Sequence, residues 1–341
     1  MNNFIYLVYY ILKTNYKELS ASLNCCRNKG LNVFGLIIDM IWSSLRYGSS
    51  FVDYFNFRFY EKDHQKRRAY ATMGFMYRYH REINDQKKIR EVDSKELFPH
   101  RFGAWCNKSY VFTKDDIDQF NHFLLSKVGQ KIVFKDPNST AGKSIKIVSV
   151  TKKENLIYLG NQHLKDFLNQ EFALKHSIYC EDFIIQHNSI QAISPSGVNT
   201  IRIISMVTKE KTVVIIAALF RISVNCPIDN YSAGNLAAEI DPVTGIVLKG
   251  GIRKRSACDD YHDFHPITKM PIRGFEIPFW DETIVMIKEA AMIVPEVRSI
   301  GWDVAITNTG PILIEGNSQW NKDTFQIPAG YGKKDVLLRY I

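Results

Sequence analysis

The chain has 341 residues, which is enough for two or three domains or for one large multi-lobed unit with a sizeable core. Hydrophobic residues make up 45% and charged residues 23%, a mixture that excludes disordered, collagen-like and low-complexity chains. The formal net charge of +9 favours anionic partners such as phosphates, nucleic acid or an acidic membrane face, although a solvated basic surface explains it equally well.

The cysteines and the apolar runs indicate in which cellular compartment the protein is expected. The six cysteines form no C-x-x-C pair, so we expect neither a zinc site nor a disulfide framework. The apolar run at 4–12 follows no basic residue, and both it and the run at 31–42 are too short to span a bilayer. We therefore expect a cytoplasmic protein. Whether residues 4–12 belong to a core or touch the inner membrane face stays open.

The first 95 residues differ from the rest of the chain. Basic and aromatic residues crowd together between positions 60 and 90 in a broadly helical pattern, almost without Gly or Pro. This pattern indicates either a solvated helical face or a docking patch for an anionic partner. Pro99 and Gly103 then interrupt it, so we expect a helical, basic region at 1–95 and a second domain at 96–341.

Helical and extended segments are interspersed in the second domain. Apolar residues recur at helical spacing in three segments, 115–127, 161–171 and 280–293. Strand-like composition marks five others, 131–135, 144–150, 177–181, 200–207 and 212–222. This order predicts an α+β fold.

Residues 299–317 predict an antiparallel hairpin that carries two facing carboxylates. Two β-rich runs flank a turn composition, Asn308-Thr309-Gly310. With the turn centred on Thr309, Asp303 faces Glu315 and Asn317 lies on the same face. The apolar neighbours, which are Val304, Ile306, Ile312 and Ile314, then point to the other side. Like charges opposite one another destabilise a strand pair unless a cation lies between them, which favours a Mg²⁺ site; an exposed acidic face is the alternative.

A magnesium site of this kind requires a segment that holds phosphate, and residues 131–144 offer one. Lys135 ends a predicted strand and precedes a polar loop rich in small residues, whose backbone N–H groups can point at a triphosphate. The loop is not a Walker motif, because Pro137 occupies the place of the first glycine. Taken alone, Lys135 is better explained as an ordinary exposed lysine at a strand end.

These residues stand in the order and spacing of the ATP-grasp superfamily, and the chain resembles its sugar-transfer-associated branch over residues 95–330. The most specific stretches are G-V-N-T-I-R-I at 197–203, D-N-Y-S-A-G-N at 229–235, and G-W-D at 301–303 followed by E-G-N at 315–317. The resemblance implies an ATP-grasp fold with two α+β lobes that hold ATP between antiparallel sheets. The lobe with the phosphate loop would span about 110–180 and the lobe with the metal site about 181–330, after the helical N-terminal region.

The resemblance also assigns roles to residues. It makes Asp303, Glu315 and Asn317 the magnesium ligands, and Lys135 a contact of the α- and β-phosphates. It places the loop that closes over ATP at Ser139, Gly142, Lys143 and Ser144, and the adenine-binding hinge at Glu181, Phe183 and Ile184. Arg202, with Arg221 and Asn230, would contact the transferred phosphoryl group, unless Arg202 forms a buried structural pair with a carboxylate. The chain departs from the pattern where many relatives carry a ribose-binding acid, because it has Gln186, His187 and Asn188 there.

The implied activity is that of an ATP- and Mg²⁺-dependent carboxylate–amine ligase acting through an acyl phosphate. By analogy with the branch, the substrates would be a uronic-acid sugar or glycan and an amino acid or other amine, in polysaccharide (capsule) biosynthesis. The alternatives are a sugar or glycan kinase, and a non-catalytic nucleotide-binding module docked on a membrane glycan assembly by its N-terminal helices. None of these functions involves nucleic acid.

Overall fold

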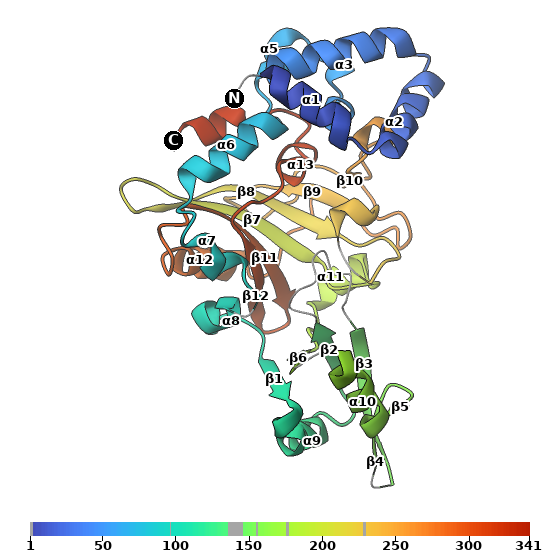
Figure 1. The fold of residues 1–341 in the computed structure, drawn as a ribbon, viewed down its shortest axis with the longest axis vertical. Coiled ribbons are helices and arrows are strands. Elements are labelled where there is room, and N and C mark those ends of the chain that lie inside the picture. Colours follow the sequence, from blue (N-terminus) through green and yellow to red (C-terminus); the bar gives the residue numbers. More distant parts are fainter. Residues whose placement is uncertain (1–2, 96, 136–145, 155, 175–176, 228–229) are drawn as a thin grey trace.

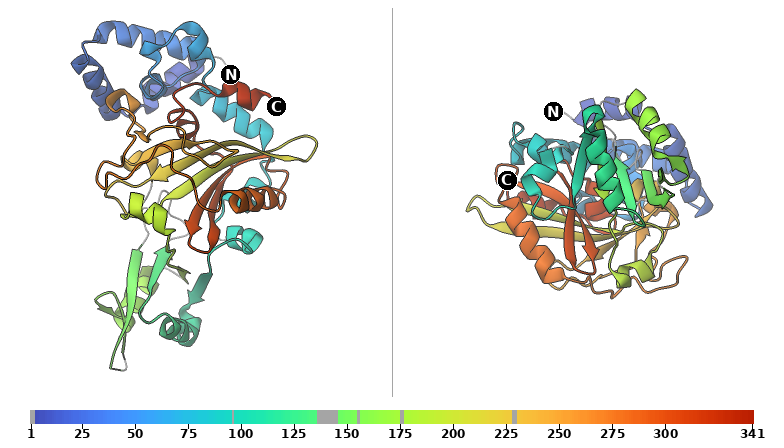
Figure 2. Two further views of the ribbon diagram at one scale, coloured as in Figure 1. Left: turned by 180° about the vertical axis from the view of Figure 1, so that it is seen from behind. Right: turned by 90° about the horizontal axis from the view of Figure 1, so that it is seen from below.

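The computed structural model describes residues 3–95, 97–135, 146–154, 156–174, 177–227 and 230–341. A helical region, a large sheet and a smaller lobe follow one another along the long axis of the molecule (Figure 1). The same order is seen from behind in Figure 2. The site residues predicted from the sequence are distributed over the large sheet and the small lobe.

The N-terminal region is helical, as predicted. Its helices are α1 (Asn3–Lys13), α2 (Tyr16–Asn28), α3 (Val33–Tyr47), α4 (Phe51–Asn56), α5 (His64–Arg68), α6 (Met73–Ile83), α7 (Ile89–Asp93) and α8 (Leu97–Phe102). Polar side chains fix several starts: Asn15, Asn32, Ser50 and Asp63 each accept a hydrogen bond from a backbone N–H of the first turn. Ser50 and Asp53 form a reciprocal capping box.

The small lobe is a six-stranded antiparallel sheet in the order β1-β6-β2-β3-β4-β5. Its strands are β1 (Ser109–Thr113), β2 (Lys131–Lys135), β3 (Lys146–Lys153), β4 (Leu156–Leu159), β5 (Gln162–His163) and β6 (Ser177–Asp182), and its helices are α9 (Ile117–Ser126) and α10 (Leu164–Leu174). Phe120 and Leu124 of α9 are buried in the lobe's core, as their helical spacing predicts. The helix predicted at 161–171 instead begins after a two-residue strand.

The large lobe contains the second sheet, which is antiparallel in the order β10-β9-β8-β7-β11-β12. Its strands are β7 (Thr200–Val207), β8 (Val213–Ile222), β9 (Leu236–Ile240), β10 (Ile252–Arg253), β11 (Ser299–Thr307) and β12 (Gly310–Asn317). Its helices are α11 (Asn188–Ile193), α12 (Trp280–Ala291), α13 (Lys322–Gln326) and α14 (Lys334–Leu338). Every residue of β7 and β11 is buried, so these two strands form the centre of the lobe.

Helices on both sides of position 95 share hydrophobic cores with the large sheet. Val92 and Phe98 pack in the same cluster as Trp302 and Leu313. Further upstream, Tyr79 of α6 packs in the cluster that holds Trp320 and Phe325. A domain boundary at about residue 95 stays a prediction, but it would divide a continuous core.

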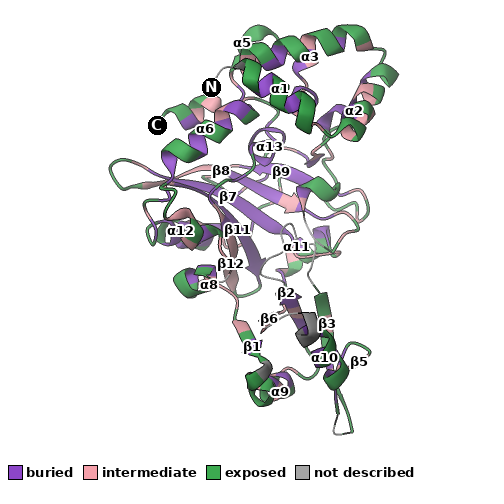
Figure 3. Cartoon of the chain, viewed as in Figure 1, coloured by how far each residue is buried: buried purple, intermediate pink, exposed green. Residues whose placement is uncertain are grey.

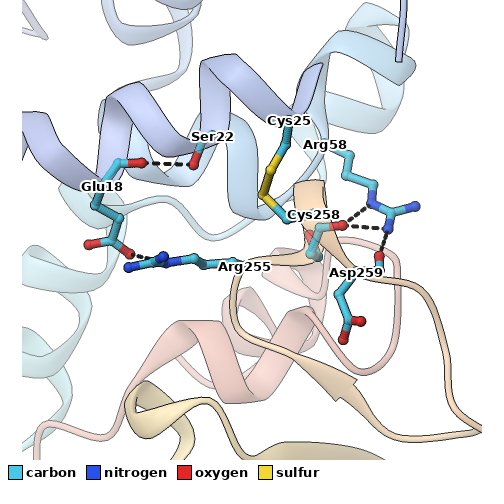
Figure 4. Close-up of a disulfide and its surroundings, with 8 residues drawn as sticks. Glu18, Ser22, Cys25, Arg58, Arg255, Cys258 and Asp259 are labelled. Carbon is cyan, nitrogen blue, oxygen red and sulfur yellow. Dashed lines mark hydrogen bonds and ion pairs between the residues drawn. A yellow bond between two sulfur atoms is a disulfide. The ribbon is translucent and has the colours of Figure 1, made fainter. Parts of the chain in front are cut away.

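A disulfide joins the helical region to the large lobe. Cys25 of α2 is bonded to Cys258, 233 residues further along the chain (Figure 4). Arg58 donates to the backbone oxygens of Ser256 and Asp259 beside it, and Arg255 lies 3.7 Å from Glu18. The expectation of no disulfide framework was therefore wrong, because cysteines so far apart leave no spacing signal.

We predict that Cys258→Ser lowers the free energy of unfolding of the oxidised protein by about 2–4 kcal/mol, since the cross-link restricts a very long loop in the unfolded chain. Urea denaturation would measure the loss, and Cys226→Ser, which removes a free thiol, should leave stability nearly unchanged. A non-reducing peptide map without a linked Cys25–Cys258 peptide would contradict the pairing.

Candidate active site

A row of polar side chains crosses the large sheet. The register places Arg202 of β7 opposite Asp303 of β11, and Asp303 opposite Glu315 of β12. Directly opposed residues of neighbouring strands share a face, so these three groups lie on one side of the sheet. On the other side, Trp302 and Val304 are buried in the core with α12. The sheet thus holds a guanidinium and two carboxyl groups in line.

The hairpin confirms the predicted pairing of Asp303 with Glu315, although its turn and strand register differ from the predicted ones. Thr307 pairs with Gly310, so the connecting loop has two residues and the register is one residue off the predicted one near the turn. A bulge between Asp303 and Val304 restores it. The prediction that Ile312 and Ile314 occupy the core side was wrong, because the bulge reverses the alternation on β12. Its buried apolar side chain is Leu313, whereas Ile312 and Ile314 are only half-buried.

Two arginines hold Asp303. Arg202 binds both carboxylate oxygens, through Nε to Oδ1 and through Nη2 to Oδ2 at 2.8 Å. Arg221 Nη1 donates to Oδ2 at 2.9 Å. Burial alone would raise the pKa of Asp303, but the two guanidinium groups outweigh it and keep the pKa well below its usual range. The buried structural pair left open for Arg202 is therefore present, and both arginines predicted to be catalytic bind the aspartate predicted to bind the metal.

Glu315 is the carboxyl group of the row that resists ionisation. Burial and the neighbouring Asp303 charge raise its pKa to about 7, and a hydrogen bond with Asp303 adds to the shift. Asn317 lies opposite Gly301, and its amide nitrogen is 3.4 Å from Glu315 Oε1. The arrangement is therefore a pair of carboxyl groups in contact, with an amide beside them.

The donor set fits a divalent cation. Carboxylate and amide oxygens are the ligands that Mg²⁺ prefers, and a cation beside Glu315 would replace the proton that now separates two like charges. Asp303, Glu315 and Asn317 are the residues that would hold it. Among the residues that the structure describes, no cluster of three or more His, Cys, Asp or Glu side chains offers a competing metal site.

The predicted nucleotide side lies on the small sheet. The register places position 135 at the end of β2 opposite Tyr179 of β6, and Val133 opposite Glu181. Ile132 and Cys180, one residue away on each strand, are buried in the core under α9 and α10. Positions 135 and 181 therefore share the sheet face that points away from these helices. The side chain of Lys135, and Ser139, Gly142, Lys143 and Ser144 as a whole, lie outside the described residues.

The predicted hinge connects the two sheets. β6 ends at Asp182, and Gln186 already pairs with Thr307 of the large sheet, so Phe183 and Ile184 lie in the short connection. The Lys131 ammonium group lies 5.4 Å from the centre of the Phe183 ring. A ligand bound by Phe183 and Ile184 would therefore contact the segment that joins the two lobes.

The residues at the place of a ribose-binding acid have structural roles instead. Gln186 is buried, and its side-chain oxygen accepts hydrogen bonds from the backbone and side-chain nitrogens of Asn199. His187 caps α11 through the backbone N–H of Ser189. These contacts hold the connection that follows β6 against the residue that precedes β7.

Asn230 is not brought to the row by any described contact. Its side-chain oxygen accepts from the backbone N–H of Ser232 in a short 3-10 turn, and its backbone oxygen accepts from Asn235. Within the described part of the chain, no hydrogen bond links it to Arg202 or Asp303. Its assignment to the phosphoryl pocket stays a prediction.

Two further charged residues, which the sequence did not single out, extend the row. Glu239 of β9 lies opposite Leu219 of β8, which lies opposite Arg202. The buried Lys333 ammonium group is 2.6 Å from Glu239 Oε1. Nothing in the pattern marks this pair, because Glu239 sits alone in an apolar strand and Lys333 belongs to a polar C-terminal segment.

The model of the sugar-transfer associated ATP-grasp family matches residues 75–339. This chain belongs to that family. The match begins in α6 and runs through α14, so it includes both sheets, the hinge and the row around Asp303. Both the family and the α+β ATP-grasp fold predicted from the sequence are confirmed. No curated protein matches the chain.

Similar solved structures are distant. An N5-carboxyaminoimidazole ribonucleotide synthetase bound to ADP is 8% identical, with 68% of this chain and 46% of that chain covered and a TM-score of 0.41. The ATP-grasp ligase PsnB with its minimal precursor is 11% identical, with coverage of 76% and 63% and a TM-score of 0.44. A D-alanine–D-alanine ligase from Bacillus anthracis is 14% identical, with coverage of 73% and 66% and a TM-score of 0.39. The chain spans less than two thirds of the first two proteins.

We predict that Glu315→Gln stabilises the metal-free protein as the pH rises. The folded-state pKa of Glu315 is raised, so its ionisation between pH 5 and pH 8 costs the wild type roughly 2–3 kcal/mol of stability, which the neutral amide does not lose. Urea denaturation in a chelating buffer at both pH values would measure this difference. The exposed Glu289→Gln is the control, and an equal offset between Glu315→Gln and wild type at the two pH values would contradict the assignment.

Proposed function

We propose that this protein is an ATP-dependent carboxylate–amine ligase that requires Mg²⁺. The observation that carries the proposal is the buried row in which Arg202 and Arg221 meet Asp303 beside the protonatable Glu315. With Asp303 ionised and the pKa of Glu315 raised to about 7, the two guanidinium charges outweigh the carboxylate charge below neutral pH. The resulting positive balance suits the phosphates of a nucleotide.

The proposed reaction has two steps. The substrate carboxylate oxygen attacks the γ-phosphorus of ATP, and the bond between the γ-phosphorus and the bridging β-phosphate oxygen breaks. ADP departs, and an acyl phosphate is formed. The amine nitrogen then attacks the acyl carbon, the C–O bond to phosphate breaks, and the amide forms with loss of a proton from nitrogen. Arg202 and Arg221 would stabilise the charge on the phosphoryl oxygens and on the tetrahedral oxyanion.

The remaining residues would bind and orient. Asp303, Glu315 and Asn317 would hold Mg²⁺, which when bound supplies positive charge against the β- and γ-phosphate oxygens. Lys135 would contact the α- and β-phosphates, and the hinge at Glu181, Phe183 and Ile184 would hold the adenine. The segment 139–144 would cover the phosphates and keep water from the acyl phosphate.

The family's association with sugar transfer supports a substrate that contains a sugar. A uronic-acid residue of a sugar nucleotide or glycan supplies a carboxylate, and an amino acid or another amine is the second substrate. The setting would be polysaccharide biosynthesis.

Product analysis tests the ligase. Purified protein with ATP, Mg²⁺, uronic acids and a panel of amines should release ADP and phosphate in equal amounts and form an amide. Glu315→Gln should lose at least about a hundredfold in turnover, since a neutral amide cannot replace a carboxylate ligand. Phosphate retained on a sugar hydroxyl would identify a kinase instead. ATP binding without any ADP release would leave only a nucleotide-binding module.

The phosphate contact of Lys135 has a separate test. Lys135→Ala should weaken ATP binding about ten- to a hundredfold, the scale of one charge-assisted contact, and leave adenosine binding unchanged because the charge acts on phosphate. Calorimetry would measure both ligands, with the exposed Lys152→Ala as a control for general loss of charge. Equal ATP affinity in wild type and Lys135→Ala would remove this segment from the site.

A further inference from the structure

Helix α3 presents an apolar face to solvent. Its buried residues are Leu36, Met40, Ser43 and Ser44, so two serines face the interior. The exposed residues include Phe34, Ile38, Ile41, Trp42 and Leu45, and Phe34 is 73% exposed. At about 100° per residue these five positions fall on one side of the helix. A surface helix normally has the reverse arrangement, with its apolar side inward.

Helix α1 adds a second apolar face beside it. The helix carries no charged residue before Lys13. Ile5, Val8, Tyr9 and Leu12 are exposed on one side, and Leu12 is 75% exposed. Figure 3 shows both helices largely exposed, at the end of the molecule away from the small lobe. These four residues and the five of α3 form what we call the apolar face.

A groove connects the two helices. It has a volume of about 280 Å³ and is lined by apolar side chains of α1, α2 and α3, among them Leu7, Ile11, Ile37 and Ile41. Contiguous apolar surface of this kind marks a binding surface in a folded protein. No described helix has the length and apolar character needed to cross a bilayer.

Basic side chains adjoin the apolar face. Arg46 lies one turn beyond Trp42 on α3, with its guanidinium 5.4 Å from the centre of the Trp42 ring. Arg46 also lines a cavity of about 190 Å³ together with Arg68, Arg78 and Lys334. We call these four residues the basic cavity; a fifth basic residue, Arg67, is already neutralised there by Asp39.

Three cations of the basic cavity are not matched by ion pairs. Within the described residues, Arg68, Arg78 and Lys334 form no ion pair with a carboxylate. Burial, Arg68 and Arg78 lower the pKa of Lys334, and the neighbouring Asp335 opposes them only in part. Cations that repel one another across a cavity favour an anion between them. The cavity thus suits a phosphate group.

We propose that the apolar face docks on an anionic lipid bilayer, with a lipid phosphate in the basic cavity. The apolar side chains would enter the boundary between headgroups and acyl chains, with Trp42 and Tyr9 at the depth that aromatic residues prefer. The basic cavity would face the negative headgroups. A bilayer is favoured over a protein partner because it supplies a broad apolar layer and phosphate groups together, which the two adjoining surfaces require.

Vesicle sedimentation with the full chain tests the proposal. Wild type should bind vesicles that contain phosphatidylglycerol and bind pure phosphatidylcholine at least about tenfold more weakly. The double variant Ile38→Ser with Leu45→Ser should lose binding to both kinds of vesicle. The double variant Arg68→Ala with Arg78→Ala should lose about tenfold or more on phosphatidylglycerol only, and its residual binding should depend less on salt than wild-type binding does.

Matched controls lie in the large lobe. Val243→Ser changes an apolar side chain that is 83% exposed, and Lys288→Ala removes an exposed charge of α12; both should bind as wild type does. Absence of binding to phosphatidylglycerol vesicles, or equal binding by all variants, would overturn the proposal. Light scattering offers a further test. A wild-type dimer that is absent in the Ile38→Ser, Leu45→Ser variant would also overturn the proposal, because the apolar face would then be covered by a second copy of the chain.

Discussion

Asp303 carries a negative charge inside the large sheet, and the neighbouring side chains are arranged around that charge. A buried carboxylate is costly unless it is paired and hydrogen-bonded. Arg202 reaches it from the next strand and Arg221 from the strand beyond, so the pairing requires β8, β7 and β11 in their observed order. Glu315, on the remaining side, is buried beside an already charged neighbour, and both effects raise its pKa. The charge state of each group thus follows from strand order.

The part of this arrangement that lies within one hairpin could be predicted. Alternation and turn composition predicted a hairpin with Asp303 opposite Glu315, but they placed the turn one residue away from its observed position. The same argument could not predict the bulge, since the bulge depends on how β12 packs on its neighbours. It compensates for the shorter turn and so restores the Asp303–Glu315 pairing, while Leu313, and not Ile312 or Ile314, is buried in the core.

Contacts between distant segments could not be predicted from the pattern. The Cys25–Cys258 bond and the Glu239–Lys333 pair each join residues whose local sequence looks ordinary. The same holds for Lys322, which is buried between Asp53 of α4 and Asp323 of α13 at 2.6 and 2.7 Å. Hydrophobic periodicity reports which face of an element is buried, not which other element covers it.

The helical region is fixed on the large lobe by several contacts, and these contacts keep its apolar face exposed. Asp39, on the buried half of α3, binds Arg67 through both oxygens and accepts from Tyr54, so the rotation of α3 about its own axis is fixed. The Lys322 network and the disulfide fix α4 and α2 in turn. A helix anchored in this way cannot turn its apolar side inward. The exposed side chains are therefore a preorganised surface, whose cost in water is offset only when another apolar phase covers it.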